Sequence, residues 1–108
     1  MRETEKDIEA YLIAQVSKRD GLCWKFTSPG RRGVPDRWCA VCGFQFFAEL
    51  KGPRHKARSD EKLQKAIHEK MAKRNVKTYV LETKQDIDLL MRYLDNSILP
   101  EVRYFARL

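Results

Sequence analysis

The feature that most constrains the fold is a change in the period of the apolar residues along the chain. Residues 4–19 carry apolar side chains at helical spacing, with Thr4 as the expected N-cap and Asp20-Gly21 as the stop. Residues 22–27, 37–42 and 44–50 are short segments with aromatic residues, typical of strands. A helix followed by three strands is therefore predicted for the first half.

The second half repeats the alternation between helical and strand patterns. Ser59 is a suitable N-cap for a helix, 77–81 reads as a strand, and Thr83 with Asp86 forms a possible capping box for a helix ending near Asn96. The apolar stripe expected to face inward on the first of these helices comprises Leu63, Ile67 and Met71. The order αβββαβα, followed by a tail, predicts an α/β sandwich around a mixed sheet.

The length and the cysteine content limit the class of protein. A chain of 108 residues is expected to form one domain, here 1–108, because it can build one core and little more. It contains neither a membrane-spanning stretch of roughly 18 apolar residues nor an apolar signal segment. The odd set Cys23, Cys39 and Cys42 argues against a disulfide framework, so we expect a soluble cytoplasmic protein with reduced thiols.

Positive charge is concentrated in one part of the chain. Residues 51–77 hold ten Lys or Arg against three acids, an excess that equals the net charge of +7 for the whole chain. Such a local excess attracts polyanions, most often nucleic acid. A solvated lysine-rich helix face would explain part of the same pattern.

Three residues in the middle of the chain form a candidate reaction centre. Alternation along 44–50 places Glu49 and Lys51 on one face, and a tight turn at Gly43 returns this strand to the end where Asp36 begins the preceding one. Two carboxylates and the backbone carbonyl of Leu50 are oxygen ligands suited to Mg²⁺. The sequence leaves open whether Lys51 acts as a base or as a charged clamp, and whether one or two ions bind.

Gly33-Val34-Pro35-Asp36 followed by Glu49-Leu50-Lys51 resembles the motif of the PD-(D/E)XK nuclease superfamily, and within it the VRR-NUC domain of the standalone phage or bacterial type. The resemblance implies a restriction-endonuclease-like αβββαβ core at about 4–82, with a mixed central sheet flanked by helices. A C-terminal helix and tail, 83–108, would follow. It also implies a DNA endonuclease that uses Mg²⁺ or Mn²⁺.

The same resemblance implies two further catalytic residues. Glu5 stands where the family has a glutamate on its first helix, and Gln64 where it has a glutamine on the helix after the Glu-x-Lys motif. Glu9 is the rival to Glu5 on the same helix, and Glu5 could equally be an exposed first-turn acid. His68 lies one turn beyond Gln64 and could approach the phosphate, although a structural role is the alternative.

The basic residues around this centre are candidates for phosphate contacts. They are Arg31, Arg32, Arg54, Lys56, Arg58 and Lys65. Standalone relatives of the VRR-NUC type imply a homodimer that cuts branched DNA such as four-way junctions. The apolar tail 98–108 could pack either on its own domain or on a second copy.

Two other classes of function are compatible with the sequence. One is a non-catalytic nucleic-acid-binding module in which the same acids cap the sheet. The other is a zinc-stabilised interaction domain built on Cys39 and Cys42 with Cys23 and His55 or His68, although strand placement favours buried thiols. Strand placement also predicts that the core contains the aromatic residues Trp24, Trp38, Phe44, Phe46 and Phe47.

Overall fold

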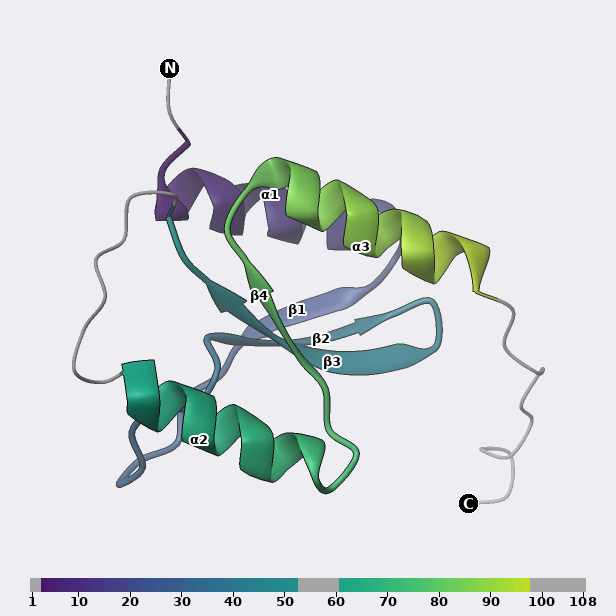
Figure 1. The fold of residues 1–108 in the computed structure, drawn as a ribbon. Coiled ribbons are helices and arrows are strands. Elements are labelled where there is room, and N and C mark those ends of the chain that lie inside the picture. The colour runs from purple at the N-terminus through teal and green to yellow at the C-terminus, as the bar shows by residue number, and fades with distance from the viewer. Residues whose placement is uncertain (1–2, 53–60, 98–108) are drawn as a thin grey trace, which may run out of the picture.

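The computed structural model describes residues 3–52 and 61–97, and these contain three helices and four strands. Their order along the chain is αβββαβα, as predicted. Helices α1 and α3 cover one face of the sheet and α2 lies on the other (Figure 1). The elements are α1 Glu5–Lys18, β1 Leu22–Lys25, β2 Arg37–Val41, β3 Phe44–Leu50, α2 Glu61–Ala72, β4 Thr78–Leu81 and α3 Lys84–Asn96.

The sheet is mixed, in the order β1-β2-β3-β4. The first three strands are antiparallel and β4 pairs parallel to β3, after the crossover through α2. A two-residue turn joins β2 to β3, with Cys42 at φ 54° and Gly43 at φ 86°. Positive φ at both positions matches the twist of a hairpin, so the predicted tight turn at Gly43 is confirmed.

Two of the helices begin at capping boxes. The hydroxyl of Thr4 accepts a hydrogen bond from the amide of Asp7, whose carboxylate accepts one from the amide of Thr4. Thr83 and Asp86 make the same reciprocal pair at the start of α3. These side chains satisfy amides that a helix start leaves without partners, which explains why both starts were readable from the sequence.

The core lies between the sheet and the layer formed by α1 and α3. Buried residues of α1 (Ile8, Leu12 and Val16) meet the inner face of β3, which carries Phe46, Ala48 and Leu50. Helix α3 adds Ile87, Leu90, Met91 and Leu94, so this helix is part of the core and not an appendage to it. The other face of β3 is consequently available for polar side chains.

Several details differ from the sequence-based expectations. Strand β1 ends at Lys25 rather than 27 and β2 at Val41 rather than 42. Trp24, expected in the core, is 58% exposed, and Leu63, expected on the inward stripe, is 37% exposed. Leu63 belongs to α2, and the register Trp24–Trp38–Phe47 puts Trp24 on the α2 side of the sheet. The layer that covers this side is one helix wide (Figure 1).

Within residues 3–52 and 61–97, no helix is long and apolar enough to cross a membrane. The predicted N-cap Ser59 and the tail 98–108 lie outside the described residues.

Candidate active site

Asp36 and Glu49 meet at one end of the sheet. The hairpin register pairs Arg37 with Ala48, which brings the start of β2 beside the end of β3. The Asp36 carboxylate accepts a 2.8 Å hydrogen bond from the backbone amide of Leu50, the residue after Glu49. The backbone carbonyl of Asp36 also accepts a 2.8 Å hydrogen bond from Phe26. Backbone contacts thus hold this carboxylate against the end of β3.

The turn that precedes Asp36 packs closely against α2. Gly33 has φ 86°, and a Cβ at this position would lie 3.0 Å from Cγ of Leu63 and 3.4 Å from the amide of Gln64. Both the conformation and the space therefore require glycine here. Because Pro35 is buried beside it, the turn is held between α2 and the sheet.

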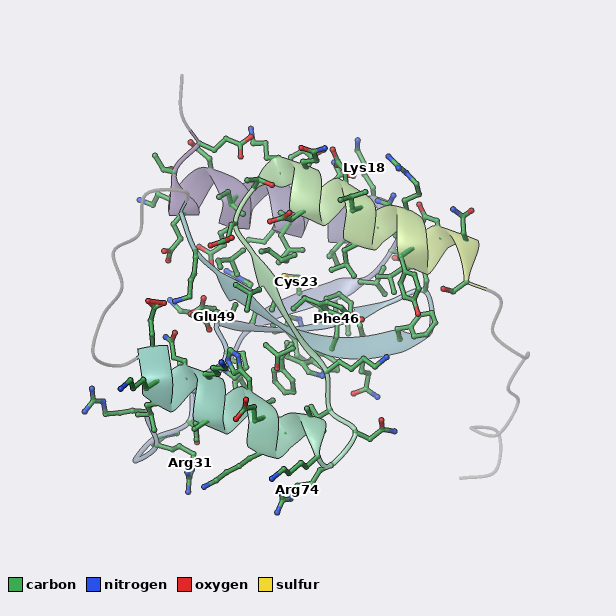
Figure 2. The ribbon with its side chains drawn as sticks, in the orientation of Figure 1. Lys18, Cys23, Arg31, Phe46, Glu49 and Arg74 are labelled. Carbon is green, nitrogen blue, oxygen red and sulfur yellow. The ribbon has the colours of Figure 1, made fainter. Side chains whose placement is uncertain are left out.

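Glu49, Lys51 and Gln64 lie together on the α2 side of the sheet. Glu49 is only 4% exposed, and among the described residues it is the one charged residue that is buried. Figure 2 shows it at the level of the sheet, on the side toward α2. Nζ of Lys51 lies 3.8 Å from the Glu49 carboxylate and donates a 2.9 Å hydrogen bond to Oε1 of Gln64. Asp36, Glu49, Lys51 and Gln64 are called the carboxylate-lysine cluster below.

The first helix presents two acids toward this region, and they differ in what they contact. Glu9 forms a 2.8 Å ion pair with Arg37, the residue that follows Asp36, so it fastens α1 to β2. Glu5 is exposed, which agrees with the alternative of an exposed first-turn acid. It nevertheless lies against Gly52, where an added Cβ would be 3.6 Å from that of Glu5. Of the two acids, Glu5 stands nearer the end of β3.

His68 lies close enough to the cluster to be affected by its charges. Burial lowers the pKa of His68, the positive charge of Lys51 lowers it further, and Asp36 acts in the opposite direction. The lowered pKa favours the neutral imidazole at pH 7. It lines an open cavity together with Lys51 and Gln64, and Thr78 of β4 lies on the opposite wall.

Basic side chains lie on the part of the molecule that carries α2. Arg31 and Arg32 are exposed in the loop before β2, and Lys65 is exposed on α2. Arg31 and Arg74 project from the side of the molecule that carries α2, away from α1 and α3 (Figure 2). The other predicted phosphate contacts, Arg54, Lys56 and Arg58, lie outside the described residues.

The three cysteines occupy different environments. Cys39 is buried and Cys23 half-buried, with their Sγ atoms 3.6 Å apart on paired strands, whereas Cys42 is exposed at the turn. The hydrogen bond with Cys23 and burial raise the pKa of Cys39, which keeps that thiol protonated. Over residues 3–52 and 61–97, no three His, Cys, Asp or Glu side chains are grouped so that they could hold a metal.

Sequence reasoning did not single out Thr78 or the Arg37–Glu9 ion pair. Thr78 is aligned with Phe47 and therefore shares the face of the sheet that carries Glu49. The alternation along 77–81 separates the residues of the strand into two faces. Which face carries Thr78 follows only from the parallel register of β4 with β3. A signal for Arg37 was its place directly after Asp36 in an otherwise apolar strand.

The fold has known counterparts. A solved structure described as a VRR_NUC domain superposes with a TM-score of 0.72 at 24% sequence identity, covering 84% of this chain and 98% of that one. Residues of this chain also align at 49% identity over 53 positions with "Putative nuclease p44" of Acyrthosiphon pisum secondary endosymbiont phage 1. That alignment spans 48% of this chain and 57% of the phage protein. No protein-family model matches the chain.

Proposed function

Because the chain has the VRR-NUC fold, we propose that it is a metal-dependent endonuclease that hydrolyses phosphodiester bonds in DNA. The observation that carries this proposal is the buried Glu49 carboxylate beside Lys51. The Asp36 carboxylate is fixed next to it by a hydrogen bond from the backbone amide of Leu50. Burial of a carboxylate destabilises the fold, because the charged group loses its hydration. A functional role explains a carboxylate at this position better than packing does. The nuclease name of the phage relative supports the same class of activity.

The donor atoms of the cluster fit Mg²⁺ or Mn²⁺. Glu49 is buried on the face of the sheet that carries Lys51, and Asp36 has a second carboxylate oxygen besides the one bound to the Leu50 amide. With the backbone carbonyl of Leu50 these are hard oxygen ligands, and such ions retain several waters when so bound. The bound ion would supply a Lewis acid for the phosphate and a water of lowered pKa.

Lys51 is the residue of the cluster best placed to act on the substrate. Gln64 and Glu49 hold its ammonium group from two elements, α2 and β3. A cation so fixed can orient the attacking water or balance the charge that develops on the phosphate oxygens. Gln64 acts through Lys51 as a positioning residue. Glu5, beside Gly52, is a further candidate to orient water at the edge of the site.

The basic residues supply the contacts with DNA. Arg31, Arg32 and Lys65 are exposed, and we assign Arg54, Lys56 and Arg58 to the same role from the sequence. We further propose that the substrate is branched, such as a four-way junction, and that a homodimer cuts one strand per site. The setting would be the cytoplasm of a bacterium or of its phage-infected cell.

The test compares wild type with Glu49→Gln and Asp36→Asn on branched and linear DNA, with Mg²⁺, Mn²⁺ or EDTA. We expect cleavage with either ion and none in EDTA, and a loss on the order of 10²-fold or more in each variant, because each removes a ligand charge. Asp20→Asn is the matched control, since Asp20 is an exposed carboxylate in the turn after α1. Salt-sensitive DNA binding without cleavage in all samples would instead establish a binding module.

A further inference from the structure

An open cavity extends from the carboxylate-lysine cluster along the space between α2 and the edge strand β4. Its volume is about 580 Å³, within the range of sites that hold small organic groups. Lys51 and Gln64 lie on its wall, and His68 and Thr78 line it from α2 and β4. The cavity is therefore continuous with the proposed reaction centre.

Two polar atoms on its walls are buried without protein partners. Within residues 3–52 and 61–97, Nε2 of His68 and Oγ1 of Thr78 are buried and make no hydrogen bond. Each such atom costs free energy when it is left unsatisfied, so a partner from outside the protein is expected. The two residues belong to different elements, α2 and β4, and both line the same cavity, which indicates one ligand and not two separate defects.

The charge of the lining argues against a phosphate as that ligand. The positive side chains are balanced by an equal number of carboxylates, namely Lys51, Lys62 and Lys65 against Glu61, Glu69 and Glu82. Ala72 and Val80 add methyl groups. A neutral imidazole and a hydroxyl can each donate or accept a hydrogen bond. An uncharged ring with both donors and acceptors on its edge fits this lining best.

We propose that the cavity binds an unpaired nucleobase of the DNA strand whose phosphate lies at Lys51, through hydrogen bonds with His68 and Thr78. This assignment rests on the proposed nuclease function, since it takes DNA as the substrate. A base within a duplex cannot leave its stack without cost, whereas a base at a branch point is already partly released. The cavity would therefore make the enzyme selective for branched or frayed DNA.

The experiment measures binding under conditions that do not permit cleavage. Branched DNAs carrying one abasic residue at each successive position around the branch are titrated with protein in EDTA. With wild type, we expect one position at which loss of the base weakens binding by about tenfold, in keeping with the free energy of a good base contact. A 2-aminopurine at that position should change its fluorescence when the protein binds.

The double variant His68→Leu, Thr78→Val tests whether the cavity is responsible. It should bind intact DNA more weakly and lose the penalty for the abasic residue, because the missing base no longer has hydrogen-bonding partners. Gln45→Ala, an exposed residue at the other end of β3, should retain the penalty. Thermal unfolding checks the fold, and Thr78→Val alone should not lower Tm, since it removes a buried hydroxyl that has no partner.

The outcomes separate this proposal from the nuclease itself. Metal-dependent cleavage without any position-specific abasic penalty overturns the nucleobase site and leaves the nuclease intact. A penalty that persists in the double variant also overturns it. If DNA binds with the expected penalty but no metal supports cleavage, the nucleobase site stands and the catalytic proposal fails.

Discussion

Lys51 is held by oxygen atoms on two sides, and this arrangement bears on its role. Its ammonium group donates to Gln64 and lies 3.8 Å from the Glu49 carboxylate. Its side chain is 17% exposed, so solvent screening of the Glu49 interaction is reduced. A fixed cation of this kind suits a charged clamp on the phosphate, and it makes Lys51 the residue at which clamp and base can be distinguished.

We expect Lys51→Arg to retain more activity than Lys51→Ala, because arginine preserves the positive charge, although its planar guanidinium group differs in shape from the lysine ammonium group. The rate constant for cleavage should fall on the order of 10²-fold in the alanine variant. The measurement is single-turnover cleavage at saturating DNA. Equal losses in both variants would contradict the clamp and favour a proton-transfer role. Lys18→Ala, an exposed lysine on α1 at the opposite face of the sheet, is the control.

At the level of elements, α3 depends on its capping box. Thr83 starts this helix, which contributes four buried residues to the core. The cap satisfies amides at the point where β4 ends and the chain turns back over the sheet, so its loss should destabilise the helix start and the packing that follows.

Thr83→Ala should lower the free energy of unfolding by about 1 kcal/mol, because the hydroxyl that accepts from the Asp86 amide is removed. In thermal unfolding this corresponds to a fall in Tm of roughly 4 °C for a domain of this size. Thr27→Ala, an exposed threonine outside the helices and strands, should leave Tm unchanged. Equal values of Tm for both variants would show that the cap contributes nothing.

The elements whose signals are local were predictable from the sequence. The N-cap Thr4 of α1, the capping box of α3 and the turn at Gly43 depend on neighbouring residues, and the structure places all three as expected. The meeting of Asp36 with the end of β3 followed from the hairpin alone. The site was therefore predictable to the extent that it is built from one hairpin.

Features that depend on how layers cover one another were not predictable. Trp24 has strong strand propensity, yet it lies on the edge strand β1. Among the described residues, its one ring contact is with Trp38 on the neighbouring strand, at a centroid distance of 5.2 Å. Propensity indicates a strand but not whether a helix covers its face. The cavity between α2 and β4 was not predictable for the same reason, since its lining residues follow only from the parallel register of β3 and β4.

At the scale of the whole molecule, one exposed apolar surface bears on assembly. Three exposed apolar side chains, Val80, Leu89 and Tyr93, line one cavity of about 390 Å³ between β4 and α3. This surface of the described residues and the apolar tail 98–108 are the candidates for a contact with a second copy.

We predict a homodimer that becomes monomeric when the chain is ended at Asn96, because truncation removes the apolar tail. Multi-angle light scattering at micromolar concentration measures both states directly. A monomeric intact protein contradicts the dimer, whereas a dimer that survives truncation contradicts the role of the tail. Leu89→Glu in the intact chain then tests the surface on α3.

Strand β3 has a hydrophobic face toward α1 and α3, and on the other face it carries Glu49. Alternate residues of β3 belong to the two faces of the sheet. A shift of one residue in its strand register would therefore bury Glu49 in the hydrophobic core and expose Leu50. Misaligned molecules would thus be too unstable to accumulate. Correct packing of the interior therefore also fixes the position of the Glu49 carboxylate in the proposed site.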